Sequence, residues 1–434
     1  MHKQAFALAT IGTLLEWAEY TFYGYMALTL SQLFFPANEP HIALIKTFSI
    51  FAFGYFMRPL GAVIFGHIGD KLGRKPALMV SMFLMGIATL GMGLMPTYHQ
   101  IGVLAPLGLL VLRTLQGIAV SGEYHGAGIF LIEKFGSRRP CFVGSLIPAS
   151  AAMGMVIGGF AAMLVSLPGA PTWAWRVPFL MGGLGCWIAW ILRCSLSETS
   201  VFLEAKSHHA LSRIPLLTTL RDHWRSLIFT AGVAAIVGVY VYIGNIYLVT
   251  FLHHQAHLSQ SLASMIAMLG ELLTALLIPL MGWWADHVNP KQMLKRAIVA
   301  IMFGGPMIFG LCQSGNALYL SLAMLIYALL NAALCAPMVK VLFDLFPAGT
   351  RFTGNAFAWN IAVAIFSSTA PMIAKQLHYQ FNWIYGPGIY ISLIAIIAYV
   401  CLQFKDQQNE TTHSKPYSVH NQSLRSSPTT FSGT

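Results

Sequence analysis

Two glutamates stand close together in an apolar part of the sequence, within the stretch GTLLEWAEYTFYGYM (12–26). Glu16 and Glu19 are three positions apart, so a helix would place them on one face, one turn from each other. Tyr20 and Tyr23 extend that face and are candidate contacts for a solute. Charged groups in apolar helices usually face the interior of a bundle or a water-filled cavity. A carboxyl group in a partly dehydrated cavity can exchange a proton near physiological pH, and we expect this chemistry of both glutamates.

An arginine in the apolar stretch 102–133 is a candidate for binding an anion. Arginine stays charged and holds a carboxylate through two parallel hydrogen bonds, so Arg113 is the expected anchor for a substrate carboxylate, with Gln116 beside it. Arg58, which precedes Pro59, is interpreted as structural. The alternative for all these arginines and glutamates is a fixed ion pair that only holds helices together.

Other polar and aromatic groups lie in apolar stretches. Glu123 and His125 are candidates for a proton relay, because histidine titrates near neutral pH. Rings, amides and a carboxylate suit a small polar solute or a quaternary ammonium group, although they also serve as packing and hydrogen-bonding groups between helices. The candidate solute contacts of this kind are Tyr242, Asn245, Tyr247, Glu271, Trp359 and Asn360. No phosphate-binding glycine loop, catalytic triad or metal-ligand spacing is found, so we expect no enzyme activity, cofactor or metal.

The composition indicates the class of protein whose helices carry these groups. The chain has 434 residues, of which 56% are hydrophobic and only 9% charged, whereas soluble domains carry about 25% charged residues. This predicts an all-α polytopic membrane protein. The net charge of +11 comes from lysines and arginines in short loops, a pattern of membrane orientation that does not indicate nucleic-acid binding.

Twelve stretches are long and apolar enough to span a membrane. They cover 5–34, 42–69, 76–96, 102–133, 141–166, 174–194, 226–252, 260–284, 295–314, 317–345, 353–374 and 384–404. Most of the 25 lysines and arginines fall on one side of this map, which places both termini in the cytoplasm. The predicted organisation is a six-helix half (1–194), a cytoplasmic linker (195–225), a second six-helix half (226–404) and a disordered tail (405–434).

A loop between the second and third spans carries a family motif. It reads GHIGDKLGRK and contains Gly66, Asp70, Gly73, Arg74 and Lys75; a weaker copy, GWWADHVNPK, stands at 282–291. Internal repetition of this kind marks many transporter folds. The first copy closely resembles the signature loop of the major facilitator superfamily, and the resemblance implies twelve helices in two halves with a gating role for this loop.

Further motifs resemble the metabolite:proton symporters of that superfamily. They are the stretch 12–26, FMRPLGAVIFGHIGD, RTLQGIAVSGEYHGAGIFLIE and WAWRVPF. The family includes carriers of proline, betaine, α-ketoglutarate, citrate and shikimate, so the resemblance does not fix the substrate. The chain departs from the pattern at Thr13, Glu19, Ser121 and His125. The Gly-Pro motif of the antiporters is missing from the fifth span, which favours symport.

The expected function is therefore proton-coupled symport of a small organic acid or zwitterion by alternating access. We expect a monomer in the bacterial inner membrane whose partners are the solute, protons and lipid. Two alternatives stay open at this point. One is a receptor without transport activity on a transporter scaffold, which the departures from the pattern would fit. The other is a proton-independent facilitator or a drug exporter.

Overall fold

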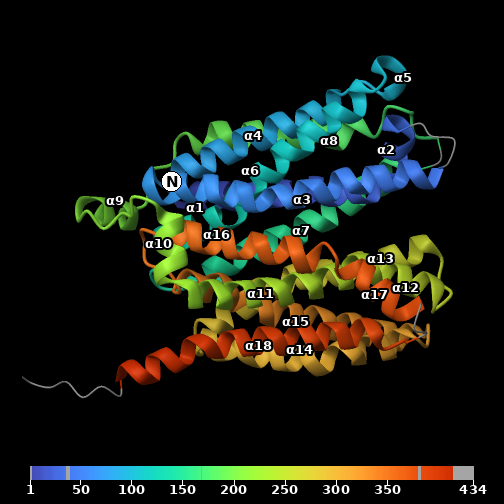
Figure 1. The fold of residues 1–434 in the computed structure, drawn as a ribbon. Coiled ribbons are helices and arrows are strands. Elements are labelled where there is room, and N and C mark those ends of the chain that lie inside the picture. The colour runs from blue at the N-terminus through green and yellow to red at the C-terminus, as the bar shows by residue number, and fades with distance from the viewer. Residues whose placement is uncertain (1, 36–39, 168, 380–382, 414–434) are drawn as a thin grey trace, which may run out of the picture.

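The computed structural model of the protein describes residues 2–35, 40–167, 169–379 and 383–413, and these are built from helices without strands (Figure 1). The helices up to the end of the linker are α1 (His2–Tyr25), α2 (Ala27–Phe34), α3 (Pro40–Lys71), α4 (Arg74–Leu94), α5 (Tyr98–Ile101), α6 (Leu104–Phe135), α7 (Pro140–Val165), α8 (Arg176–Arg193), α9 (Ser200–Ser207) and α10 (Pro215–Asp222). Those that follow are α11 (Trp224–Tyr242), η1 (Ile243–Tyr247), α12 (Leu248–His254), α13 (Gln260–Ala285), α14 (Pro290–Cys312), α15 (Ala317–Phe343), α16 (Arg351–Ala362), η2 (Val363–Ser367), α17 (Ala370–Tyr379) and α18 (Gly386–His413).

The helices confirm the predicted all-α membrane fold. Within the described residues, ten helices are long and apolar enough to cross a membrane. The two other predicted spans, 5–34 and 174–194, coincide with α1 followed by α2 and with α8. Helices are the expected form because lipid offers backbone N–H and C=O groups no hydrogen bonds, and a helix bonds its own.

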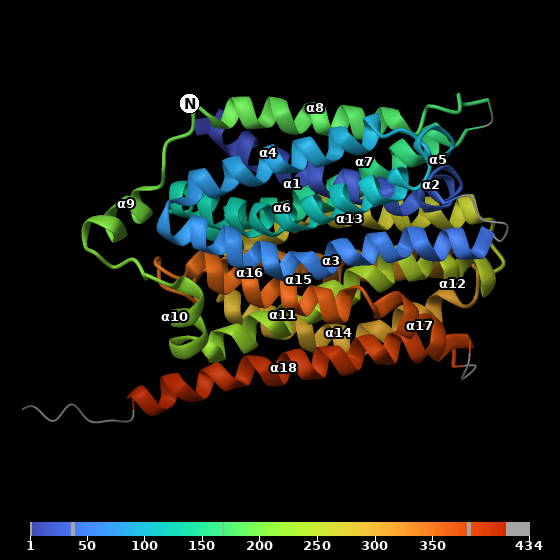
Figure 2. The ribbon, with the colours of Figure 1, turned by 45° about the horizontal axis from the view of Figure 1, so that its top comes forward.

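The bundle has two parts that face each other along one interface (Figures 1 and 2). Helices α1–α8 pack together, as do α11–α18, and the two groups meet where α3 lies on α16 and where α7 lies on α13 and α15. The short linker helices α9 and α10 lie at the end of the molecule that holds the N-terminus (Figure 2). The last helix, α18, extends to His413, past the boundary at 404 predicted from the sequence, and 414–434 lie outside the described residues.

Two long helices are interrupted by π-helical turns. The turn η1 joins α11 to α12, and η2 joins α16 to α17. A π-turn widens the helix locally and frequently marks a functional position. Asn245 lies in η1 and donates to Glu271 of the neighbouring helix α13, so this interruption links two helices of the C-terminal part through polar side chains.

Candidate functional site

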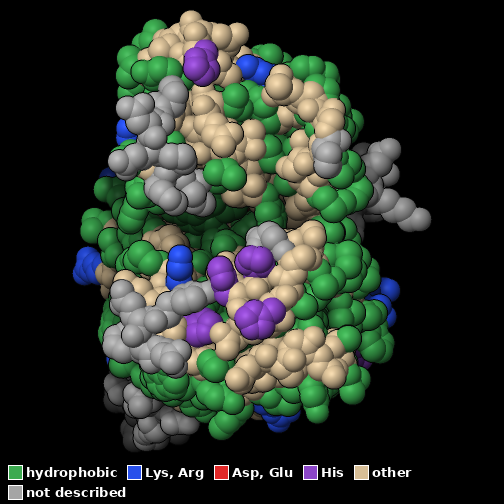
Figure 3. Space-filling model, turned by 90° about the vertical axis from the view of Figure 1, so that its right-hand side faces the viewer, with side chains coloured by type: hydrophobic (Ala, Val, Ile, Leu, Met, Phe, Trp, Pro, Cys, Tyr) green, Lys and Arg blue, Asp and Glu red, His purple; other side chains and the backbone are tan. Residues whose placement is uncertain are grey.

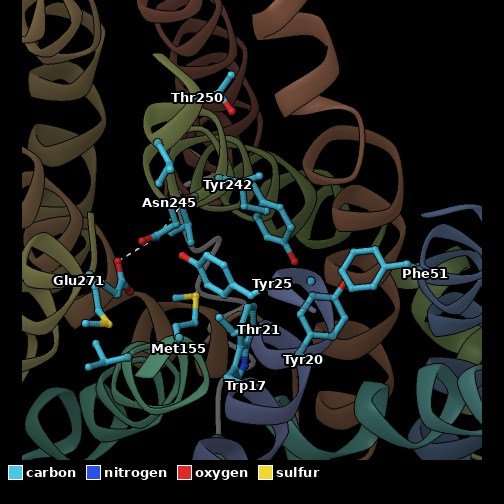
Figure 4. Close-up of a pocket in the computed structure, with 17 residues that line it drawn as sticks. Trp17, Tyr20, Thr21, Tyr25, Phe51, Met155, Tyr242, Asn245, Thr250 and Glu271 are labelled. Atoms are coloured by element: carbon cyan, nitrogen blue, oxygen red, sulfur yellow. Dashed lines mark hydrogen bonds between the residues drawn. The ribbon is translucent and has the colours of Figure 1, made fainter. Parts of the chain in front are cut away.

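A large cavity of about 240 Å³ lies between the two parts of the bundle. Tyr20 and Tyr25 of α1 and Tyr242 of α11 present their rings to it, and Asn245 and Glu271 supply polar groups (Figure 4). At the end of the molecule opposite the N-terminus, the surface is hollowed between the two parts (Figure 3). The predicted solute contacts at Tyr20, Tyr242, Asn245 and Glu271 therefore lie together around one space.

A small cavity of about 60 Å³ adjoins the large one. The two share Trp17, Tyr242 and Glu271 in their lining, and the small cavity adds Arg58 and Trp359. Arg58 is thus a cavity residue and not only the structural charge that the sequence suggested. Its guanidinium group lies over aromatic rings and makes no ion pair within 4.0 Å of the described acidic side chains.

Glu271 is the acidic residue among the described residues that line the two cavities. Its Oε2 accepts a hydrogen bond from Asn245 Nδ2 at 2.9 Å and one from the Tyr327 hydroxyl at 3.4 Å. Asn331 donates in turn to the Tyr327 hydroxyl at 3.4 Å. These donors hold one oxygen of Glu271, while no hydrogen bond from a described residue reaches the other.

Glu19 is buried in an ion pair within the N-terminal part. Its Oε2 lies 3.6 Å from Arg113 Nη1 and also accepts a hydrogen bond from Gln116, which bonds to Arg113 as well. The Arg113 guanidinium lies 3.6 Å from the centre of the Tyr23 ring. The predicted residues Glu19, Arg113, Gln116 and Tyr23 therefore form one cluster, but neither cavity is lined by them.

Glu16 lies one turn from this cluster and is also buried. Its Oε2 has no hydrogen-bond partner among the described residues. Trp17, the next residue, lines both cavities. The α1 carboxyl groups are therefore within the bundle, as the spacing predicted, and one layer behind the cavity wall.

Glu123 and His125 lie on different sides of α6. Arg193 of α8 holds both oxygens of Glu123, at 2.5 Å and 2.9 Å, and Ser81 of α4 donates to it at 3.1 Å. His125 instead packs on Trp359, with ring centres 5.0 Å apart, and lines a space of about 10 Å³. The two predicted relay residues are thus not brought together.

An aromatic stack forms the floor of the small cavity. The rings of Tyr124 (α6) and Trp359 (α16) are nearly parallel, with centres 5.7 Å apart. Both line the small cavity, and Tyr124 also borders the 10 Å³ space that contains His125 and Asn355. Since the two rings come from opposite parts of the bundle, their contact joins the two parts between the small cavity and the 10 Å³ space.

Two other predicted solute contacts have partners elsewhere. The Tyr247 hydroxyl bonds to His378 Nδ1 at 2.7 Å, and Asn360 donates to the carbonyl of Ala356 in its own helix at 2.8 Å. Neither residue lines one of the described cavities.

The segment from Gly66 to Lys75, predicted as a loop, forms the end of α3 and the start of α4. It joins the two parts at the N-terminal end of the molecule. Asp70 accepts backbone hydrogen bonds from Phe352 and Thr353, at 3.0 Å and 2.8 Å, in the first turn of α16. A carboxylate is stabilised there by the free N–H groups and the helix dipole. Any side chain at Gly66 would meet the backbone of Thr353, so glycine permits this close approach.

The charges around Asp70 form a buried group that we call the inner network, made of Asp70, Arg74, Glu133 and Arg351. Glu133 Oε1 lies 3.1 Å from Arg74 Nη2 and 2.9 Å from Arg351 Nη1. Arg74 also donates to the carbonyls of Gly69 and Ala348, both at 2.8 Å. Arg74 follows Gly73, whose φ of +130° suits glycine, and the Lys75 ammonium donates to the carbonyl of Cys194.

The weaker repeat at 282–291 makes an equivalent contact, from the C-terminal part to a helix of the N-terminal part. Asp286 accepts backbone hydrogen bonds from Cys141 and Phe142, at 2.7 Å and 2.9 Å, at the start of α7. Asp70 therefore caps a helix of the C-terminal part, and Asp286 caps one of the N-terminal part. The repeat of Asp in the two loops was the signal for this pair, but the function of Asp286 was not predicted.

The sequence also gave no indication of several lining residues. Trp17 and Tyr25 stand in the stretch 12–26 but were not singled out there, and Phe51 and Asn331 belong to no motif; all four contribute to the cavities. Within the described part of the chain, no group of three or more His, Cys, Asp or Glu side chains could hold a metal ion. The site is thus aromatic, with few charges, and suits a small polar solute.

Comparison of the sequence with known proteins identifies a family that it matches. The profile of the Major Facilitator Superfamily matches residues 8–371 and 245–428. The chain is 33% identical to the glycine betaine/proline/ectoine/pipecolic acid transporter OusA of Dickeya dadantii, over 91% of this chain and 81% of that one. It is 30% identical to the citrate-proton symporter of Klebsiella pneumoniae, over 89% of this chain and 88% of that one.

Solved structures agree with the fold. The proton:xylose symporter XylE superposes with a TM-score of 0.68 at 15% identity, covering 93% of this chain and 95% of XylE. The fucose:proton symporter FucP, in an outward conformation, gives a TM-score of 0.67 at 13% identity, covering 92% of this chain and 98% of FucP. At such identities the likeness concerns the fold alone.

Proposed function

The chain belongs to the Major Facilitator Superfamily, and we propose that this multi-pass membrane transporter is a proton-coupled symporter of a small organic acid or zwitterion. It would work in the bacterial inner membrane as a monomer with both termini in the cytoplasm. The relatives, which include transporters of betaine and proline and a citrate-proton symporter, support this class of solute.

The observation that carries the proposal is the balance of buried charge. Apart from the inner network, the buried carboxyl and guanidinium groups of the described helices are Glu16, Glu19, Glu123 and Glu271, and Arg58, Arg113 and Arg193. Carboxyl groups thus outnumber guanidinium groups by one. A lone charge inside a membrane protein is costly. The interior is electrically neutral when one carboxyl group carries a proton, which is the state that a proton-coupled carrier needs.

Glu19 is our choice for the coupling residue. Its Oε1 has no hydrogen-bond partner among the described residues, and its single ion pair with Arg113 is long, at 3.6 Å. Tyr20, the next residue, lines the large cavity. Glu123 is less suited, because Arg193 holds both of its oxygens. Glu16, with an oxygen that also lacks a partner, is the second choice.

The arrangement also favours alternating access. The large cavity lies between the two parts, while the Tyr124–Trp359 stack and the inner network join them beneath it. Opening at the N-terminal end requires these contacts to separate. A site at the interface between two repeats, with one side closed, is the arrangement on which rocking of one half against the other depends.

The test is uptake into proteoliposomes under an imposed pH gradient. We expect accumulation of labelled proline, glycine betaine, ectoine or citrate when the outside is acidic, and loss of this accumulation with a protonophore. Glu19→Gln should take up solute without response to the gradient, whereas Glu204→Gln, a matched change on the exposed face of the linker, should behave as the wild type.

Two outcomes would contradict the proposal. Uptake by the wild type that is indifferent to the gradient would indicate a facilitator. If Glu19→Gln kept the full response to the gradient, Glu19 would not be the coupling residue, and Glu16→Gln would be measured next.

A further inference from the structure

We propose that the two cavities form one binding site for a compact zwitterion, with Glu271 and the aromatic rings receiving its cationic group and Arg58 receiving its carboxylate. The inference rests on the proposed function and narrows its solute class. It assigns the anion-binding role to Arg58, and not to Arg113 as the sequence suggested.

One acidic and one basic side chain of the described residues reach the cavities. Among the described lining residues of the large and small cavities, the charged side chains are Glu271 and Arg58. Both are more than nine-tenths buried. A zwitterion carries one charge of each sign, so it can pair with both Glu271 and Arg58. A dicarboxylate would place a second negative charge beside Glu271 in a membrane interior, where unpaired charge is costly.

The two groups are also free to bind. Arg58 makes no ion pair within 4.0 Å of a described acidic side chain. Glu271 makes no ion pair either, and its hydrogen bonds from Asn245 and Tyr327 occupy one of its oxygens. In contrast, Arg113 is already paired with Glu19 and bonded to Gln116, outside the cavity lining.

The cationic end of the site is aromatic. The rings of Tyr25 and Tyr242 border the space that Glu271 also borders (Figure 4). The Tyr20 ring belongs to the Arg58 end, because its centre lies 5.1 Å from the Arg58 guanidinium. The face of such a ring attracts an ammonium group within about 6 Å of its centre. Because an aromatic face attracts a cation without accepting a hydrogen bond from it, the site suits quaternary ammonium groups, which have no N–H, as well as secondary ones.

The test uses matched solutes and purified protein without a gradient, so it is independent of transport. Glycine betaine, choline and 3,3-dimethylbutanoate share one shape: choline lacks the carboxylate, and dimethylbutanoate lacks the cationic charge. Proline, ectoine and succinate complete the set. Binding is measured by calorimetry in detergent at concentrations up to about 10 mM, above the usual range of KM values.

We expect at least one zwitterion to bind, at least tenfold more tightly than its singly charged analogue or succinate. Glu271→Gln should remove the preference over dimethylbutanoate, and Arg58→Gln should remove the preference over choline. Glu204→Gln and Arg213→Gln are the matched controls on the exposed linker. If Arg58→Gln does not fold, Arg58→Lys replaces it; this variant keeps the positive charge but loses the paired N–H donors of the guanidinium group. It should weaken zwitterion binding about tenfold.

Tighter binding of succinate than of every zwitterion, or no zwitterion binding at all, would overturn the inference. So would preferences that Glu271→Gln leaves unchanged. The proposed function could still hold in these cases, because uptake of citrate driven by the pH gradient would show symport of an organic acid. Conversely, zwitterion binding without proton-dependent uptake would refute the function and retain the site.

Discussion

The two loop aspartates should hold the N-terminal end of the transporter closed. Asp70 and Asp286 each accept two backbone hydrogen bonds from the first turn of a helix in the opposite part, at 2.7–3.0 Å. Substitution by asparagine preserves the size and one acceptor oxygen but removes the negative charge and the second acceptor. The substitution at Asp286 therefore perturbs the contacts between the two parts, and the substitution at Asp70 also removes an ion pair of 3.4 Å with Arg74.

The size of the effect follows from these bonds. A hydrogen bond to a charged group contributes about 1.5–3 kcal/mol, and a carboxylate at a helix N-terminus about 0.3–1 kcal/mol. Each substitution should weaken the closed state by about 2 kcal/mol, a shift of about 30-fold in the equilibrium between closed and open. The two sites are in separate loops, so their effects should add to about 4 kcal/mol.

Cysteine labelling measures this shift. Asn355 is buried beneath the Tyr124–Trp359 stack and lines the 10 Å³ space. With the native cysteines replaced by alanine, a cysteine at position 355 should react slowly in the parent protein. It should react faster by tens-fold with Asp70→Asn or Asp286→Asn, and faster still with both. A variant that keeps only the exposed Cys194 should react equally in all backgrounds. Labelling of position 355 within twofold of the parent in the double variant would refute the reasoning.

Two further predictions concern buried pairs. Arg193→Met should leave Glu123 as an uncompensated buried charge and destabilise the protein by about 3–5 kcal/mol. Adding Glu123→Gln to this variant should recover most of the lost thermal stability, measured in detergent. Equal loss of stability in the single and the double variant would contradict the pairing. The hydroxyl groups of Tyr55 and Tyr242 bond to each other across the two parts, so Tyr55→Phe or Tyr242→Phe should each cost about 1–3 kcal/mol. A double-mutant cycle should show that the two losses do not add, and strict additivity would mean that the bond does not form.

The sequence predicted the elements and the groups that each helix carries. Periodicity placed Glu16 and Glu19 on one buried face of α1, and the repeated loops indicated two related halves. These features depend on spacing within one segment or on likeness between segments. Both are properties of the chain before it folds.

The partners of the charged groups could not be predicted in the same way. Arg113 was expected to bind solute but is paired with Glu19, and Arg193, which formed part of no prediction about the site, is buried against Glu123. Arg58 was expected to be structural but lines the small cavity. Which guanidinium group meets which carboxylate depends on how separate helices pack, and helical spacing says only which face a residue occupies.

The central claim is that a proton crosses the membrane together with the solute, and proton movement driven by the solute tests it most directly. Proteoliposomes with a pH-sensitive dye inside would receive, with no imposed gradient, a solute that the wild-type protein takes up. The account predicts that the interior becomes more acidic as the solute enters, that a protonophore abolishes the signal, and that Glu19→Gln produces none. Entry of labelled solute into wild-type liposomes with no change of internal pH would contradict it.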